Sequence, residues 1–153
     1  MITNIHLQHF RSYRDEIFEF EPGVNIVVGP NGSGKTNLLE AVLMVATGSS
    51  YRVDDQDLVQ FNEQWARIDA VSEQEKRVLK LQQEGERTKK SYIFDDKPYK
   101  ILTFNHSLPV VLFEPNHLQL LHGQPEQRRK DIDNLLEQMH PSFQTTRKHY
   151  RRA

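Results

Sequence analysis

The sequence has no cysteine, no long apolar run and almost no net charge, and each absence narrows the possible classes of protein. Without cysteine, cysteine-ligated zinc is excluded, and the composition fits a reducing compartment. No apolar run approaches the ~20 residues that span a bilayer, and residues 1–6 lack the basic and apolar regions of a signal peptide. The formal charge of −1 at pH 7 does not by itself indicate binding to nucleic acid. We therefore expect a soluble cytoplasmic protein, whose 153 residues suffice for a domain with a real core.

One short segment carries the strongest functional signal. Residues 29–36, Gly-Pro-Asn-Gly-Ser-Gly-Lys-Thr, match the pattern G-x-x-x-x-G-K-[ST] of the phosphate-binding P-loop. An apolar segment of strand type, residues 24–28, precedes the match, and residues 37–46, rich in helix formers, follow it. Strand, glycine loop and helix in this order are the context that a P-loop requires. The pattern therefore predicts an α/β protein that binds a nucleotide.

The residue types of this segment suit a triphosphate, which needs many N–H donors and a neutralising cation. Glycines let the backbone approach the phosphates, successive N–H groups form an anion nest, and the following helix adds partial positive charge at its start. Lys35 is expected to reach the β- and γ-phosphates, and the Thr36 hydroxyl is expected to ligate Mg²⁺. The candidate nucleotide-binding residues are Gly29, Pro30, Asn31, Gly32, Ser33, Gly34, Lys35, Thr36 and Asn37.

The rest of the chain predicts a sheet with early antiparallel strands and a helical end. Alternation of apolar and polar residues, bounded by glycine and proline, is the basis for the strands. Strands are predicted over residues 2–10, 17–21, 24–28, 65–71, 77–83, 90–94 and 108–113. Helices are predicted over residues 37–46, 57–61, 116–122, from Pro125 to Pro141, and over 142–153. Gly48 is expected to end the P-loop helix, and turns are expected at 84–86 and 95–98.

Beyond the P-loop, short motifs recur along the whole chain. They are residues 7–13 (Leu-Gln-His-Phe-Arg-Ser-Tyr), 22–25 (Pro-Gly-Val-Asn), 29–41, 108–115, 123–129 (Gly-Gln-Pro-Glu-Gln-Arg-Arg), Asp133, and the final Tyr150-Arg151-Arg152-Ala153. This combination resembles the amino-terminal part of the RecF family, DNA-repair ATPases with ABC-type heads related to the SMC proteins. The resemblance implies an ABC-type P-loop head with an antiparallel β subdomain over residues 1–123. It implies the start of a helical arm over residues 124–153.

The same resemblance implies a function. Members of the family bind ATP and Mg²⁺, dimerise around nucleotide, bind single-stranded and gapped duplex DNA, and act in replication, repair of DNA damage and the SOS response. Their partners are the mediator proteins RecO and RecR. The resemblance places Arg11 near the nucleotide phosphates, and Glu114 where related heads carry a glutamine that senses Mg²⁺ and the γ-phosphate.

A basic group near the C-terminal end of the sequence is a separate candidate for DNA binding. Its members form two i,i+4 pairs with no acid between residues 138 and 153. They are Arg147, Lys148, Arg151 and Arg152. A solvated helix surface is the plainer interpretation, and both remain open.

The sequence contains no Walker B strand, which would be four apolar residues followed by an acidic pair. The nearest match, residues 92–96, has three apolar residues before its two acids, and 110–115 has one acid before proline. We expect this chain to be an N-terminal fragment of a longer protein that carries the missing motifs further toward its C-terminus. We expect the longer protein to be a weak DNA-stimulated ATPase, and the fragment to hydrolyse ATP negligibly. Two alternatives stay open: a small P-loop kinase or nucleotide hydrolase acting on a soluble substrate, and a DNA- or partner-binding module that needs no nucleotide.

Overall fold

The computed structural model describes residues 1–73, 75–103, 106–114, 125–140, 142, 143, 147 and 150. The chain divides into two compact units, Met1–Ser107 and Leu108–Ala153. The first unit holds the sheet and the P-loop, and the second holds helix α3 (Pro125–Met139). Helix α3 begins at Pro125, as predicted, because proline suits the first helical position. No helix of the described residues is long and apolar enough to cross a membrane.

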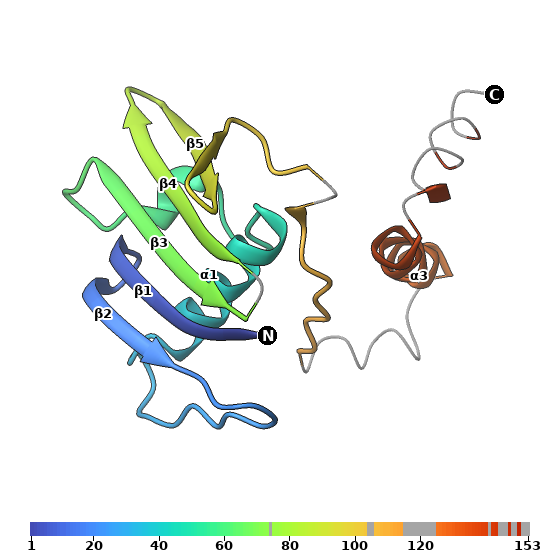
Figure 1. Cartoon of the computed structure of the whole chain (residues 1–153), viewed down its shortest axis with the longest axis horizontal. Helices are drawn as coiled ribbons and strands as arrows, with labels where there is room; N and C mark the ends of the chain where they lie inside the picture. Colours follow the sequence, from blue (N-terminus) through green and yellow to red (C-terminus); the bar gives the residue numbers. More distant parts are fainter. Residues whose placement is uncertain are drawn as a thin grey trace. The chain divides into compact units, whose positions relative to one another are not determined.

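The first unit is built on one six-stranded sheet (Figure 1). Its strands are β1 (Ile2–Phe10), β2 (Tyr13–Glu19), β3 (Trp65–Ser72), β4 (Lys76–Glu84), β5 (Arg87–Phe94) and β6 (Lys97–Tyr99). They lie in the order β2-β1-β3-β4-β5-β6, and each neighbouring pair is antiparallel. The strand predicted over residues 2–10 and the later meander are therefore confirmed, whereas the strand predicted over 17–21 runs over Tyr13–Glu19. The pairing of β1 with β3 joins these strands into one sheet.

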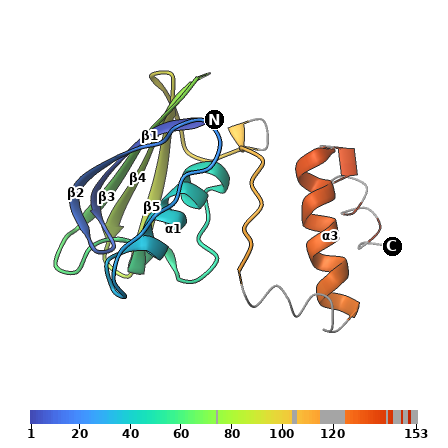
Figure 2. The ribbon, with the colours of Figure 1, turned by 90° about the horizontal axis from the view of Figure 1, so that it is seen from below.

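Helix α1 (Lys35–Thr47) lies against one face of this sheet (Figure 2). Alternation along the strands turns every second side chain toward the helix, and most of these side chains are apolar. The core they form with the helix includes Ile5, Leu7, Leu38, Ala41, Met44, Val45, Ile68, Leu79 and Leu81. Gly48 ends α1 in a left-handed conformation with φ 77°, and its N–H donates to the Met44 carbonyl oxygen at 2.8 Å, as predicted for a C-cap glycine.

A buried arginine fixes the C-terminal end of α1 to the sheet. Arg77 on β4 is only 3% exposed, and its Nη1 donates to the Val45 carbonyl oxygen at 3.2 Å. Its charge is paired with Glu75, and the guanidinium lies 5.1 Å from the centre of the Phe94 ring. A buried charge is tolerated only when it is paired, and Glu75 supplies that pairing. The hydrogen bond to the Val45 carbonyl oxygen then holds the end of α1 against the sheet. The opposite end of the helix carries the P-loop.

Two segments predicted as strands are not strands in the structure. Residues 24–28 and 108–113 have no regular secondary structure, and no strand of the described part of the chain pairs with either of them. Val24, Ile26 and Val28 are exposed, and so are Val111 and Phe113 of the segment that was expected to be a buried strand. An extended segment becomes a strand only when a neighbouring strand exchanges hydrogen bonds with it. Both predictions are therefore wrong for the described structure, because apolar pattern indicates a strand without supplying its partner.

Several shorter elements differ in type or position from their predictions. The short helix expected at 57–61 is a 3₁₀ helix, η1 (Asp55–Leu58). The predicted turn at 95–98 is tighter, because Asp95 and Asp96 adopt positive φ and β6 starts at once. The nearest Walker B match therefore ends in a hairpin turn, where Asp95 Oδ1 accepts a hydrogen bond from the Lys76 N–H at 2.9 Å. The helix expected over 116–122, and most of that expected over 142–153, lie outside the described residues.

Candidate functional site

The P-loop leads directly into the start of α1, and its glycines are required by geometry. Gly32 and Gly34 have φ of 84° and 92°, a left-handed backbone that residues with side chains rarely adopt. A Cβ at Gly34 would lie 2.8 Å from the Tyr13 hydroxyl and 2.9 Å from Ser12 Oγ. The turn between β1 and β2 therefore packs on the P-loop so closely that only glycine fits at position 34.

The first amides of α1 are available to an anion. Leu38 is the first residue whose N–H donates into the helix, to the Gly34 carbonyl oxygen at 3.0 Å. The N–H groups of Lys35, Thr36 and Asn37 precede it and have no acceptor within the helix. Together with the partial positive charge of the helix start, they form a donor set that fits phosphate oxygens.

Lys35 and Thr36 stand at this donor set. Lys35 Nζ donates to the carbonyl oxygens of Gly29 and Pro30, both at 2.8 Å, so the ammonium is held over the loop. Both acceptors are neutral, and a charged phosphate oxygen is a stronger partner for the same ammonium. The Thr36 hydroxyl makes no side-chain hydrogen bond within the described residues, which leaves it available to a cation. These side chains fit a magnesium nucleotide.

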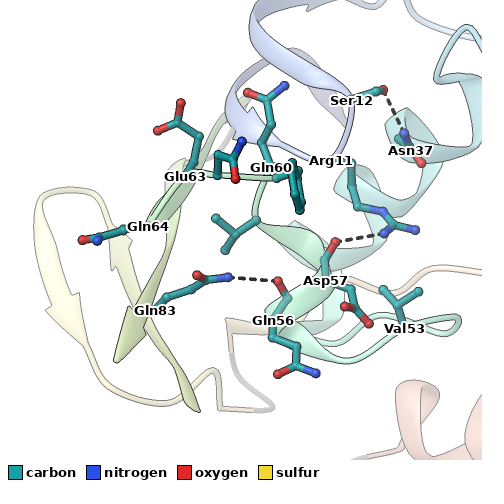
Figure 3. A pocket seen from close by; sticks show the side chains of 13 residues that line it. Arg11, Ser12, Asn37, Val53, Gln56, Asp57, Gln60, Glu63, Gln64 and Gln83 are labelled. Carbon is teal, nitrogen blue, oxygen red and sulfur yellow. Dashed lines mark hydrogen bonds between the residues drawn. The ribbon is translucent and has the colours of Figure 1, made fainter. Parts of the chain in front are cut away.

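Arg11 is tied to α1 and η1 by a network that the sequence did not reveal. Its backbone is left-handed, φ 54°, and its N–H donates to the Leu58 carbonyl oxygen at 2.9 Å. Its Nε donates to Glu40 Oε2 at 3.0 Å. Its Nη1 donates to the Asp57 carbonyl oxygen at 2.9 Å, as Figure 3 shows. Glu40 is fully buried, and its other oxygen accepts a hydrogen bond from Ser50 Oγ at 2.5 Å. Glu40 thus positions the Arg11 guanidinium.

The guanidinium lies at the wall of a cavity of about 900 Å³ (Figure 3). A guanidinium carries five N–H donors, and those of Arg11 beyond the two just described have no acceptor in the described part of the chain. On the P-loop side the cavity is lined by Ser12 and Asn37, joined by a hydrogen bond of 2.9 Å. Phe61, 89% exposed, lines it too. The cavity therefore begins at α1 and leads away toward an aromatic side chain.

The hydroxyl beside the P-loop stays protonated. Burial raises the pKa of the Tyr13 phenol above its ordinary value, and the nearby Glu16 carboxylate raises it further. A neutral phenol places no negative charge next to Gly34.

Within the described residues no group of three or more histidine, aspartate or glutamate side chains could hold a metal. A cation at the P-loop would therefore depend on a hydroxyl and on oxygen atoms of the bound ligand.

The remaining predicted site residues lie in the second unit. Arg147 donates from Nη1 to Glu137 Oε1 at 2.6 Å, and its Nε lies 3.2 Å from Asp133 Oδ2. Its charge is therefore already paired within that unit, and DNA binding by this basic group stays a prediction. Its other three members lie outside the described residues. Glu114 is half-buried, and its sensing role also stays a prediction.

The sequence did not predict Glu40 and Asp57 as the residues that position Arg11, and the reason is physical. Arg11 and Glu40 are 29 positions apart, and Arg11 and Asp57 are 46 apart, so only the fold brings them together. One signal was present, because Glu40 interrupts an otherwise apolar stretch of α1 and belongs to the motif at 29–41. A charged residue among buried helix positions predicts a buried partner.

Comparison with known sequences identifies the family. A family model described as an AAA domain matches residues 4–149. The DNA replication and repair protein RecF of Heliobacterium modesticaldum is 38% identical over 99% of this chain, and that of Geobacillus thermodenitrificans is 33% identical over 93%. The chain spans 42% of the length of the first protein and 39% of the second.

Solved structures agree on the fold. A structure of the recombination mediator protein RecF with ATP, in the RecFOR pathway, has a TM-score of 0.78 at 22% identity and covers 99% of this chain and 43% of its own. A structure on ATP-driven dimerization and DNA-stimulated activation of SMC ATPases has a TM-score of 0.67 at 24% identity, covering 88% of this chain and 98% of its own. The resemblance seen in the sequence is confirmed: the chain belongs to the AAA domain family, as a P-loop head of the RecF type.

Proposed function

We propose that this chain binds Mg-ATP and forms the phosphate-binding half of the ATP site in a RecF-type DNA replication and repair ATPase. The observation that carries the proposal is the donor set at the start of α1, where unpaired amides, Lys35 and the glycine backbone converge. The N–H groups and Lys35 hold the phosphates, and Thr36 holds Mg²⁺. Bound nucleotide would supply a phosphoanhydride bond, whose hydrolysis needs an acidic residue that the described P-loop unit does not place there.

The cavity supports a nucleoside triphosphate over a simple phosphate. Its volume of about 900 Å³ lies in the range of ligand pockets, ~300–1,000 Å³. It begins at Ser12 and Asn37, beside the residues proposed to hold the phosphates. The guanidinium N–H groups of Arg11 line the cavity, and the exposed Phe61 ring offers a surface on which a base can stack. We assign the nucleoside end of ATP to this cavity.

The alternative of a small self-sufficient kinase or hydrolase is less well supported. It requires an acid at the end of a strand beside the P-loop, to hold Mg²⁺. The nearest sequence match, Asp95 and Asp96, forms the β5–β6 turn instead, with Asp95 bound to the Lys76 N–H. The arrangement favours an ATP site that is completed by residues outside those the structure describes.

The finer features follow from the family and are part of the same proposal. We propose that the longer protein dimerises around ATP, interacts with single-stranded and gapped DNA, and works with RecO- and RecR-like partners in the cytoplasm. The division into a head, 1–123, and the start of an arm, 124–153, belongs to the proposal as well. Support comes from the RecF relatives, which are named as DNA replication and repair proteins.

The test separates phosphate binding from nucleoside binding. Isothermal titration with Mg-ATP and with magnesium tripolyphosphate compares the chain with the Lys35→Ala and Phe61→Ala variants. Lys35→Ala should weaken both ligands by roughly 10- to 100-fold, since a charge-assisted hydrogen bond contributes about 1.5–3 kcal/mol. Phe61→Ala should weaken ATP several-fold and leave tripolyphosphate unchanged.

Lys97→Ala is the matched control, because Lys97 is an exposed lysine on the distant edge strand β6. This variant should bind both ligands as the parent chain does. Equal affinities of the parent and Lys35→Ala chains for ATP would refute the proposal. Equal losses of ATP and tripolyphosphate in Phe61→Ala would refute the placement of the nucleoside.

A further inference from the structure

Within the first unit, α1 covers one face of the sheet, and no helix among the described residues of that unit lies on the other face (Figure 2). Strand alternation shows which side chains point to this outer face. Over β3, β4 and β5, basic residues outnumber acidic ones five to two there. The basic residues are Arg67, Lys76, Lys80, Arg87 and Lys89, and the acidic ones are Asp69 and Glu84. The whole chain, by contrast, has a net charge of −1.

The sheet register gathers part of this charge around an aromatic ring. Trp65 lies opposite Gln82, Arg67 opposite Lys80, and Gln82 opposite Lys89. We call these five residues the outer patch. The side chains of four of them, with that of Gln8, line a hollow of about 260 Å³. The hollow is thus lined by one aromatic ring, two cations and two amides.

The Trp65 ring is held in place and accessible. It is 37% exposed, and it meets the His9 ring edge-on, with centroids 4.5 Å apart. The contact with His9 restricts the ring and leaves exposed surface on the hollow side. An exposed aromatic ring of this kind is a platform on which an unpaired base can stack.

The cations of the outer patch differ in how far they are already neutralised. Arg67 is bound by both oxygens of Asp69, at 2.6 Å each, so its charge is largely compensated. Lys89 is 3.6 Å from Glu84, and both are well exposed, which makes that pair weak. Lys80 is exposed and has no partner among the described residues. Lys80 and Lys89 are diagonal neighbours on adjacent strands and therefore available to an anion.

We propose that the outer patch binds single-stranded nucleic acid, with a base stacked on Trp65 and backbone phosphates on Lys80 and Lys89. The inference deepens the proposed interaction with DNA and rests on that part of the proposed function. A protein partner is less well matched, because protein interfaces have an apolar centre and are depleted in lysine. A duplex is less well matched because its bases are already stacked on one another. Gln8 and Gln82 supply hydrogen bonds to base edges or sugar.

The experiment uses the intrinsic fluorescence of Trp65, the only tryptophan in the chain. Fluorescein-labelled oligothymidylate is titrated by anisotropy, and unlabelled oligothymidylate by tryptophan emission. The Lys80→Glu, Lys89→Glu double variant should bind at least tenfold more weakly at low salt. The slope of log K against log salt should fall by roughly 1.4, about 0.7 for each lost phosphate contact. Trp65→Ala should weaken binding several-fold without changing that slope.

Lys97→Glu, Lys100→Glu is the matched control. It changes two exposed lysines at edge strand β6, outside the outer patch, and should bind within about twofold of the parent chain. Tryptophan emission should be quenched at saturation. Equal losses in both double variants would overturn the proposal, as would binding with unchanged emission. Tighter binding of a duplex than of oligothymidylate would overturn it too. Lys35→Ala should retain oligothymidylate binding, so a failure of nucleotide binding is distinguishable from a failure here.

Discussion

The ion pair between Arg11 and the buried Glu40 makes the sharpest prediction about the site. Glu40 is fully buried, and its two oxygens are satisfied by Arg11 Nε at 3.0 Å and Ser50 Oγ at 2.5 Å. Arg11→Ala leaves this carboxylate buried without a counter-charge, which typically costs about 3–5 kcal/mol. That is a large share of the ~5–15 kcal/mol by which most domains are stable. The variant should therefore be close to unfolding.

Neutralising the carboxylate removes the uncompensated charge that Arg11→Ala leaves buried. Glu40→Gln keeps the shape of the side chain and loses charge-assisted hydrogen bonds, which contribute about 1.5–3 kcal/mol. The double variant Arg11→Ala, Glu40→Gln has no uncompensated buried charge. We expect it to be less destabilised than the sum of the two single variants by about 2 kcal/mol, within the range found for directly coupled residues.

Urea unfolding followed by far-ultraviolet circular dichroism measures all four chains, and an unchanged m-value licenses the comparison. Arg14→Ala, at an exposed arginine on β2, is the control and should change stability by less than about 0.5 kcal/mol. Additivity of the Arg11 and Glu40 substitutions to within about 0.5 kcal/mol would refute the reasoning, because it would mean that the two groups do not compensate each other.

Two further predictions concern a glycine and an acid. Gly34→Ala should abolish Mg-ATP binding, measured by titration calorimetry, and lower the melting temperature, because its Cβ would lie 2.8 Å from the Tyr13 hydroxyl. Gly85→Ala is the control: Gly85 also has positive φ but lies in open space, so this variant should retain binding. The hydrogen bond from His6 lowers the pKa of the Asp15 carboxyl, so its stabilising contribution is present above the ordinary aspartate pKa of 3.8 and is lost as pH falls through the lower folded-state value. The parent chain should thus exceed Asp15→Asn in stability near neutral pH, and the gap measured by urea unfolding should close under acid conditions; a gap independent of pH contradicts this.

Sequence reasoning succeeded where the signal is local. The meander of β3, β4 and β5 was predicted because alternation with period two and turn residues such as Gly85 act over a few positions. Gly48 was predicted as a helix end because a left-handed C-cap favours glycine almost regardless of context. The strand predicted over residues 24–28 was wrong, because an apolar pattern is a local property whereas hydrogen bonding to a neighbouring strand is a tertiary one.

The sequence by itself determined which residues make up the proposed phosphate site. Gly32, Gly34 and Lys35 are close neighbours, and their roles depend on backbone freedom and charge that the residue types already specify. Only the tertiary structure decided which groups surround that site. Folding brings Arg11 to Glu40 and Asp57, and places the Tyr13 hydroxyl against the loop. Such contacts join distant positions, so they follow from the pairing of strands and the packing of a helix and have no local pattern from which to be predicted.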